Sequence, residues 1–166
     1  MSQKKIYIIR HAKSSWSLST LNDFDRPLND RGKKDAPEMA KRLLNRNVKI
    51  NQFISSPALR AITTATYFAK EYNVTKDEIK IIPALYHAPA MVFFSVIEEL
   101  DDAIDSVAIF SHNPGITDFV NQLIPAGRID NMPTTGIMAI SAETTHWKEF
   151  ERSNKSMLFF DYPKLV

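Results

Sequence analysis

The stretch IYIIRHA at residues 6–12 decides the fold class. Its first four residues are β-branched or aromatic, and such a short apolar run is typical of a buried strand in a parallel sheet. The run ends in two polar residues, Arg10 and His11. Because ligands bind at the carboxyl ends of the strands in open α/β sheets, we expect Arg10 and His11 to lie in a binding crevice.

Arg10 and His11 together suit an anion, and phosphate above all. A guanidinium group matches phosphate oxygens with two parallel N–H donors, and an imidazole beside it can act as a nucleophile. An Arg-His pair on the surface at a strand end is the alternative that these two residues alone leave open.

A second apolar run, at residues 107–110, is followed by SHNPG at residues 111–115. Asn113 suits the cap of a helix, Pro114 suits its first turn, and the residues that follow have helical periodicity. We therefore expect His112 to stand at the carboxyl end of a strand, beside the free N–H groups of a helix. That position also favours an anion.

A third strand is expected at residues 52–55, followed by Ser-Pro and a helix whose first turn carries Arg60. The carboxyl ends of parallel strands lie at one edge of a sheet. Three strand ends therefore bring together Arg10 with His11, Arg60, and His112. This convergence favours a phosphate site more strongly than any single residue does.

Four apolar stripes with helical spacing alternate with the strands. We expect helices around residues 36–44, 61–69, 92–100 and 116–124, and further strands at residues 79–82, 136–140 and 157–160. This alternation predicts an α/β fold, a three-layer α/β/α sandwich with a mainly parallel central sheet, in one domain over residues 1–166. The last two strands lack a crossover helix, which indicates an antiparallel edge.

Composition excludes several classes of protein. With 166 residues, 44% of them hydrophobic and 24% charged, the chain resembles an ordinary globular domain, and its net charge of +2 argues against a nucleic-acid binder. The chain contains no cysteine, so thiol catalysis and disulfides are excluded. No apolar stretch approaches the length of a membrane span, and the first five residues lack a signal peptide, so we expect a cytoplasmic protein.

No metal or cofactor is expected. The four histidines show no pair at i, i+4, so a zinc site is not indicated. The chain has four glycines and no glycine-rich loop of the kind that cradles a nucleotide.

The motifs RHA at residues 10–12, SSP at 55–57 with Arg60, and SHNP at 111–114 resemble the histidine phosphatase superfamily. Members of this phosphoglycerate-mutase-like group form a phosphohistidine intermediate. The segment DFDRPLN at residues 23–29, with Gly32 after it, is similar to the short SixA-type phosphohistidine phosphatases, as is the chain length. The resemblance spans residues 6–135. Ala12 stands where the superfamily usually has glycine, although alanine is common in the SixA-type branch.

Roles for the site residues follow from the chemistry and from this resemblance. His11 is the expected nucleophile, with one ring nitrogen held by a backbone carbonyl and the other attacking phosphorus. Arg10 and Arg60 are expected to clamp the phosphoryl oxygens. His112 would donate a further N–H as charge develops. The SixA-type resemblance implies a third guanidinium from Arg26 in substrate binding.

The general acid is not identified by the sequence. Larger superfamily members place a glutamate near the position of residues 85–89, but no carboxylate occurs between Glu78 and Glu98. Asp23 or Asp25 could reach the leaving group, and spacing does not choose between them. Both, with Asp30, could instead simply pair with Arg26. The missing glutamate suggests a leaving group that departs with little need for a dedicated proton donor.

Two histidines lie outside these motifs. His87 could line the rim of the pocket. His146 is expected to be structural or to face solvent.

These observations predict a metal-independent phosphatase that works through phospho-His11 and acts on protein phosphohistidine. Two alternatives remain: a phosphatase of small phosphate esters or anhydrides, and a non-catalytic module that binds phosphate or a phosphoprotein. The expected partners are therefore a phosphorylated protein domain or a small phosphorylated metabolite, with no nucleic acid and no membrane.

Overall fold

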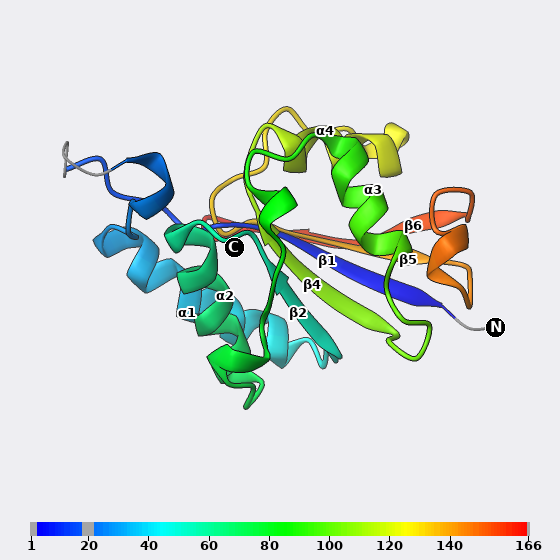
Figure 1. The fold of residues 1–166 in the computed structure, drawn as a ribbon, viewed down its shortest axis with the longest axis horizontal. Helices are drawn as coiled ribbons and strands as arrows, with labels where there is room; N and C mark the ends of the chain where they lie inside the picture. The colour runs from blue at the N-terminus through cyan, green and yellow to red at the C-terminus, as the bar shows by residue number, and fades with distance from the viewer. Residues whose placement is uncertain (1–2, 18–21, 166) are drawn as a thin grey trace.

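The computed structural model describes residues 3–17 and 22–165, and Figure 1 shows a central sheet between two layers of helices. The strands in these ranges are β1 (Lys4–Arg10), β2 (Gln52–Ser55), β3 (Lys80–Ile81), β4 (Ser106–Ser111), β5 (Ile137–Ala142) and β6 (Lys155–Asp161). Their order across the sheet is β3-β2-β4-β1-β5-β6.

The sheet is mainly parallel with an antiparallel edge. Strand β4 pairs in parallel with both β1 and β2, and β2 pairs in parallel with β3. Strand β5 runs antiparallel to β1, and β6 runs antiparallel to β5. The predicted three-layer α/β sandwich and its antiparallel edge are therefore confirmed.

Two pairs of helices cover the two faces of the sheet. The helices are α1 (Asp30–Asn45), α2 (Leu59–Glu71), α3 (Ala90–Glu98) and α4 (Gly115–Leu123), with short 3-10 helices at η1 (Asp23–Asp25), η2 (Lys76–Glu78), η3 (Pro83–Leu85), η4 (Pro125–Gly127) and η5 (Trp147–Glu149). In Figure 1, α1 and α2 lie on one side of the sheet and α3 and α4 on the other. None of the helices in the described ranges is long and apolar enough to cross a membrane.

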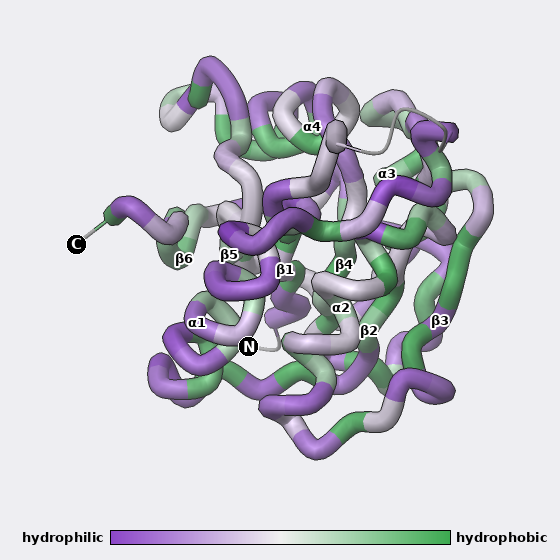
Figure 2. The backbone as a smooth tube through the Cα atoms, turned by 90° about the vertical axis from the view of Figure 1, so that its left-hand side faces the viewer, coloured by the Kyte–Doolittle hydropathy of each residue, from purple (hydrophilic) through white to green (hydrophobic). Residues whose placement is uncertain are grey.

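Side chains of β1 alternate between the two layers, as the period of a strand requires. Tyr7 and Ile9 pack in the core with α1 and α2, whereas Ile6 and Ile8 pack with α3 and α4. Strand β4 is mostly hydrophobic along its length, while much of the outer surface is hydrophilic (Figure 2). A strand buried on both faces is rigid, so β1 holds the residues that follow it in a fixed place.

Several boundaries differ from the expected ones by a few residues, and two of the differences have a clear structural setting. Helix α4 begins at Gly115, one residue later than expected, with Pro114 at the cap position. The Asn113 side chain does not cap the helix, because its Oδ1 accepts from the Thr117 hydroxyl at 2.8 Å and its amide nitrogen donates to Asn131 and to the Met132 carbonyl. Strand β3 is only two residues long, because Ile79 closes the preceding 3-10 helix.

The first turn of α1 packs directly on the segment that follows β1. Asn29 caps the helix by accepting from the Gly32 N–H at 2.9 Å, and the Asn29 N–H donates to the Lys13 carbonyl at 3.0 Å. A Cβ atom on Gly32 would lie 2.2 Å from the Lys13 carbonyl oxygen. Glycine at this position therefore permits the close approach that fixes the chain just beyond His11.

Candidate active site

A pocket of about 260 Å³ lies at the carboxyl ends of β1 and β4. Its lining residues come from the end of β1, from the segments after β1, β4 and η3, from η1 and the residue after it, from the first turn of α2 and from the segment before β5: Arg10, His11, Lys13, Ser14, Trp16, Asp23, Arg26, Arg60, His87, His112, Asn113 and Thr134. The structure therefore brings all five predicted site residues into one pocket.

His11 is held as a neutral ring with one unprotonated nitrogen. Its Nδ1 lies 2.7 Å from the carbonyl oxygen of Ala12, so Nδ1–H donates and Nε2 keeps its lone pair. Burial lowers the pKa of His11 from 6.5 to about 3; the bond to Ala12 opposes this shift, and the charge of Arg60 reinforces it. The imidazole is thus unprotonated at neutral pH, which is the form that a nucleophile requires.

One hydroxyl group links the nucleophile to the helix that carries Arg60. The Ala12 N–H donates to Thr64 Oγ1 at 2.9 Å, and this hydroxyl donates to the Arg60 carbonyl at 2.8 Å. Ala12 itself is fully buried in a small cluster with Leu28 and Ala36. The methyl group that replaces the usual glycine hydrogen is therefore packed in the core and does not reach the pocket.

Two guanidinium groups border His11. Arg60 Nε lies 3.4 Å from His11 Nε2, and its other two nitrogens donate to the Asp23 carbonyl at 2.7 Å and to Asp23 Oδ2 at 3.0 Å. Arg10 donates from Nη1 to the Met132 carbonyl, and its Nε is buried with no hydrogen-bond partner. Burial and the neighbouring Arg60 both lower the pKa of Arg10. A bound anion would accept a hydrogen bond from the unpaired Arg10 Nε, and its negative charge would offset the repulsion between Arg10 and Arg60.

His112 presents a second unpaired donor. Its Nε2 lies 2.7 Å from Ser56 Oγ, and since Nε2 is the acceptor that the described residues offer to the Ser56 hydroxyl hydrogen, we assign Ser56 as the donor. The ring proton is therefore on Nδ1, which is buried without a partner. Burial, and then the nearby His11, lower the pKa of His112 to about 3. With ring centroids 5.2 Å apart, His112 is a neutral N–H donor next to the nucleophile.

The position of Arg26 fits both interpretations that the sequence left open, a role in substrate binding and an ion pair with a nearby aspartate. It lines the pocket, and it also donates from Nε and Nη2 to Asp23 Oδ1 at 3.2 and 3.0 Å. Its Nη1 donates to Ser14 Oγ at 2.6 Å, and the guanidinium stacks over the ring of Trp16 at 3.6 Å. Trp16 is 76% exposed and was not among the predicted site residues.

Asp23 lies in the pocket and pairs with Arg26, which is the alternative that the sequence left open for this carboxylate. Partial burial raises its pKa, but hydrogen bonds from Tyr86, Arg60 and Arg26 outweigh that effect and hold the pKa well below its usual range. Tyr86 Oη donates to Asp23 Oδ2 at 2.7 Å. Asp23 is therefore ionised at neutral pH and poorly suited to act as a general acid. Asp25, the other aspartate considered for this role, is exposed and does not line the pocket.

The two remaining histidines lie where expected. His87 lines the rim of the pocket with its side chain 64% exposed, and its Nε2 is 3.7 Å from Asp23 Oδ2. His146 is also exposed and pairs with Asp102 outside the pocket. Within residues 3–17 and 22–165, no group of three His, Asp or Glu side chains is arranged to hold a metal ion.

Comparisons with known proteins agree with this geometry. The family model of the histidine phosphatase superfamily (branch 1) matches residues 6–86, which include Arg10, His11, Arg26 and Arg60. An uncharacterized protein of Mycobacterium leprae is 29% identical over 168 residues, which cover 94% of this chain and 100% of the relative.

Two solved structures have a similar fold. The proposed phosphohistidine phosphatase SixA from Agrobacterium tumefaciens superposes with a TM-score of 0.82 at 24% identity, over 96% of this chain and 98% of that one. The protein histidine phosphatase SixA complexed with tungstate superposes with a TM-score of 0.80 at 22% identity, over 95% of this chain and 96% of that one. The chain is thus similar to the histidine phosphatase superfamily over residues 6–86, and it shares the fold of these two structures over nearly its whole length.

Proposed function

We propose that the chain hydrolyses phosphohistidine on a protein, through a phospho-His11 intermediate and without a metal ion. The observation that carries the proposal is the state of His11. Its Nδ1–H donates to the Ala12 carbonyl, and its unprotonated Nε2 accepts a long hydrogen bond of 3.4 Å from Arg60 Nε. A module that only bound phosphate would need the surrounding cations, but it would not need a neutral nucleophile oriented among them.

In the first step, His11 Nε2 attacks phosphorus, and the bond from phosphorus to the leaving nitrogen breaks. Arg10 and Arg60 hold the phosphoryl oxygens, and the unpaired N–H of His112 stabilises the charge that develops on them. In the second step, water attacks phospho-His11, the bond to Nε2 breaks, and orthophosphate is released. His11 returns to its neutral form.

Among the described lining residues, Asp23 is the one carboxyl group, and its lack of a proton to donate supports phosphohistidine as the substrate. Expulsion of an alkoxide, whose conjugate acid has a pKa of about 15.7, requires a positioned acid. A phosphohistidine ring whose other nitrogen is protonated leaves as neutral imidazole, because the ring titrates near a pKa of about 6.5. Asp23 is ionised, and Asp25 lies outside the pocket. The hydroxyl of Tyr86 already donates its hydrogen to Asp23.

The test is to trap the intermediate. The protein is incubated with a substrate carrying labelled phosphohistidine and quenched rapidly. We expect label on the wild-type chain in a linkage that is stable to alkali and labile to acid. His11→Ala should show no label, should retain less than about a hundredth of the turnover, and should keep its circular dichroism spectrum.

Two controls decide between the alternatives. Turnover that disappears with EDTA would contradict the metal-independent mechanism. Small phosphate esters assayed in parallel show whether phosphohistidine is preferred, and tight phosphate binding without any turnover would indicate a binding module.

A further inference from the structure

A second cleft of about 330 Å³ opens beside the active-site pocket and shares Arg10, Lys13 and Thr134 with it. The other residues that line this cleft come from the first turn of α1, the segment before β5 and the C-terminal segment: Arg31, Pro133, Tyr162, Pro163 and Lys164. None of the roles proposed above for catalysis uses this cleft.

The cleft is strongly cationic. Four of its lining side chains are Arg10, Lys13, Arg31 and Lys164, and no carboxylate is among the described lining residues. Arg31 is still about half exposed although it pairs with Asp35 at 3.3 Å. An anion in this cleft would therefore meet positive charge from several segments at once, which favours its binding.

The wall of the cleft is held in place by the fold. Arg42 on α1 donates from Nη2 to the Leu165 carbonyl at 3.0 Å and also pairs with Asp161. These contacts tie the segment that carries Lys164 to the helix that carries Arg31. The backbone of Lys13 is held against the start of α1 by the hydrogen bond from the Asn29 N–H to its carbonyl.

We propose that this cleft is a specificity subsite for carboxylate side chains that flank the phosphohistidine of a protein substrate. The inference rests on the proposed function, since Arg10 borders both cavities and would bring the two anionic groups side by side. Lys13, Arg31 and Lys164 are exposed and come from three different segments. That spread suits the broad acidic surface of a protein better than one compact second phosphate.

The test measures binding separately from turnover. Two phosphohistidine peptides of equal length are prepared, one with Glu and Asp beside the phosphohistidine and one with Gln and Asn. Both are titrated against the His11→Ala protein, which binds without turning the peptide over. We expect the acidic peptide to bind more tightly, with an advantage that decreases as salt is added.

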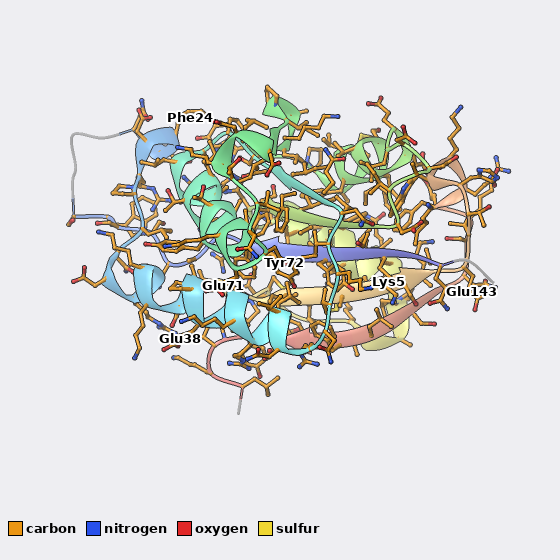
Figure 3. All side chains as sticks on the ribbon, turned by 90° about the horizontal axis from the view of Figure 1, so that it is seen from below. Lys5, Phe24, Glu38, Glu71, Tyr72 and Glu143 are labelled. Carbon is orange, nitrogen blue, oxygen red and sulfur yellow. The ribbon has the colours of Figure 1, made fainter. Side chains whose placement is uncertain are left out.

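Lys164→Glu, made in the His11→Ala background, should reduce this advantage by about fivefold, the upper range for one solvent-exposed ion pair. The matched control is Lys49→Glu, an identical charge change on an exposed residue that borders a different groove together with Lys5. Helix η1, which borders the active-site pocket, carries Phe24, and Figure 3 shows Lys5 far from Phe24, toward the opposite end of the molecule. The control should leave the advantage unchanged.

Three results would overturn the subsite: equal affinity for the two peptides, equal effects of Lys164→Glu and Lys49→Glu, or preferential binding of a small bisphosphate with no effect of peptide acidity. Failure of the proposed function is a different result. In that case the wild-type protein hydrolyses neither peptide, whereas the affinities for His11→Ala still report on the cleft.

Discussion

Asp23→Asn is expected to tighten the binding of inorganic phosphate and of tungstate. In the free protein the Asp23 carboxylate accepts from Arg60 at 3.0 Å and from Arg26 at 3.0 Å. Both arginines also line the pocket in which the phosphoryl group is proposed to bind. Asp23 therefore competes with phosphate for the same donors and repels it, which would favour release of the product.

The magnitude follows from Coulomb's law. A dianion beside His11 and the Asp23 carboxylate would share the Arg60 guanidinium, which places them on the order of 6 Å apart. Asp23 is 37% exposed, so the repulsion is screened nearly as in water. With a dielectric constant of about 80, the repulsion is about 1.4 kcal/mol, which corresponds to about tenfold in affinity. The charge-assisted bonds that Asp23 no longer makes change the affinity in the same direction.

Product inhibition provides the assay. The inhibition constant for orthophosphate and the dissociation constant for tungstate should both decrease about tenfold in Asp23→Asn. Asp25→Asn removes the same charge from an exposed position in the same 3-10 helix and should change neither constant. Weaker anion binding in Asp23→Asn would refute the reasoning, because it would mean that Asp23 chiefly positions Arg60 and Arg26 for the ligand.

Three further predictions concern stability and leaving groups. Gly32→Ala should lower the melting temperature by several degrees, because its Cβ would lie 2.2 Å from the Lys13 carbonyl oxygen and such overpacking costs about 1–3 kcal/mol. The pKa values of His11 and His112 are about 3 in the folded chain, below about 6.5 in the unfolded chain, so the unfolded chain binds protons first. The melting temperature should therefore fall as the pH is lowered from about 6.5 toward 3, and a flat profile over that range would contradict the burial of neutral rings. Finally, kcat/KM for a phosphohistidine peptide should exceed that for an alkyl phosphate by at least about a hundredfold, and equal turnover would reveal an acid that the structure does not show.

The ends of β1 and β4 could be predicted because the pattern that marks each of them lies within a few neighbouring residues. Residues 6–9 and 107–110 are short apolar runs followed at once by polar residues, and they form the adjacent parallel strands β1 and β4. Placement of Arg10, His11 and His112 at one edge follows from the parallel arrangement alone. Arg60 could be placed for the same reason, since only a few residues separate it from the end of β2.

Contacts between distant segments could not be predicted in this way. Tyr86 donates to Asp23 across 63 positions of sequence, and nothing near either residue indicates their meeting. The low pKa of Asp23, and with it the exclusion of Asp23 as the acid, depends on that contact. Asn113 fails as a cap for a similar reason: its amide nitrogen donates to Asn131 and the Met132 carbonyl, and its Oδ1, the atom that would cap, accepts from the Thr117 hydroxyl. Local propensity is overruled where a tertiary partner satisfies the same side chain.

The Thr64 hydroxyl makes the integrity of the site an all-or-none property. It accepts from the Ala12 N–H and donates to the carbonyl of Arg60, so it connects the segment after β1 with α2, alongside the hydrogen bond from Arg60 to His11. Any fluctuation that lifts the start of α2 from the sheet removes a guanidinium and releases the nucleophile in the same event. Partly assembled sites, with a reactive histidine but no clamp, should therefore be scarcely populated. The protein is protected in this way from becoming a stray phosphoryl acceptor when it opens locally.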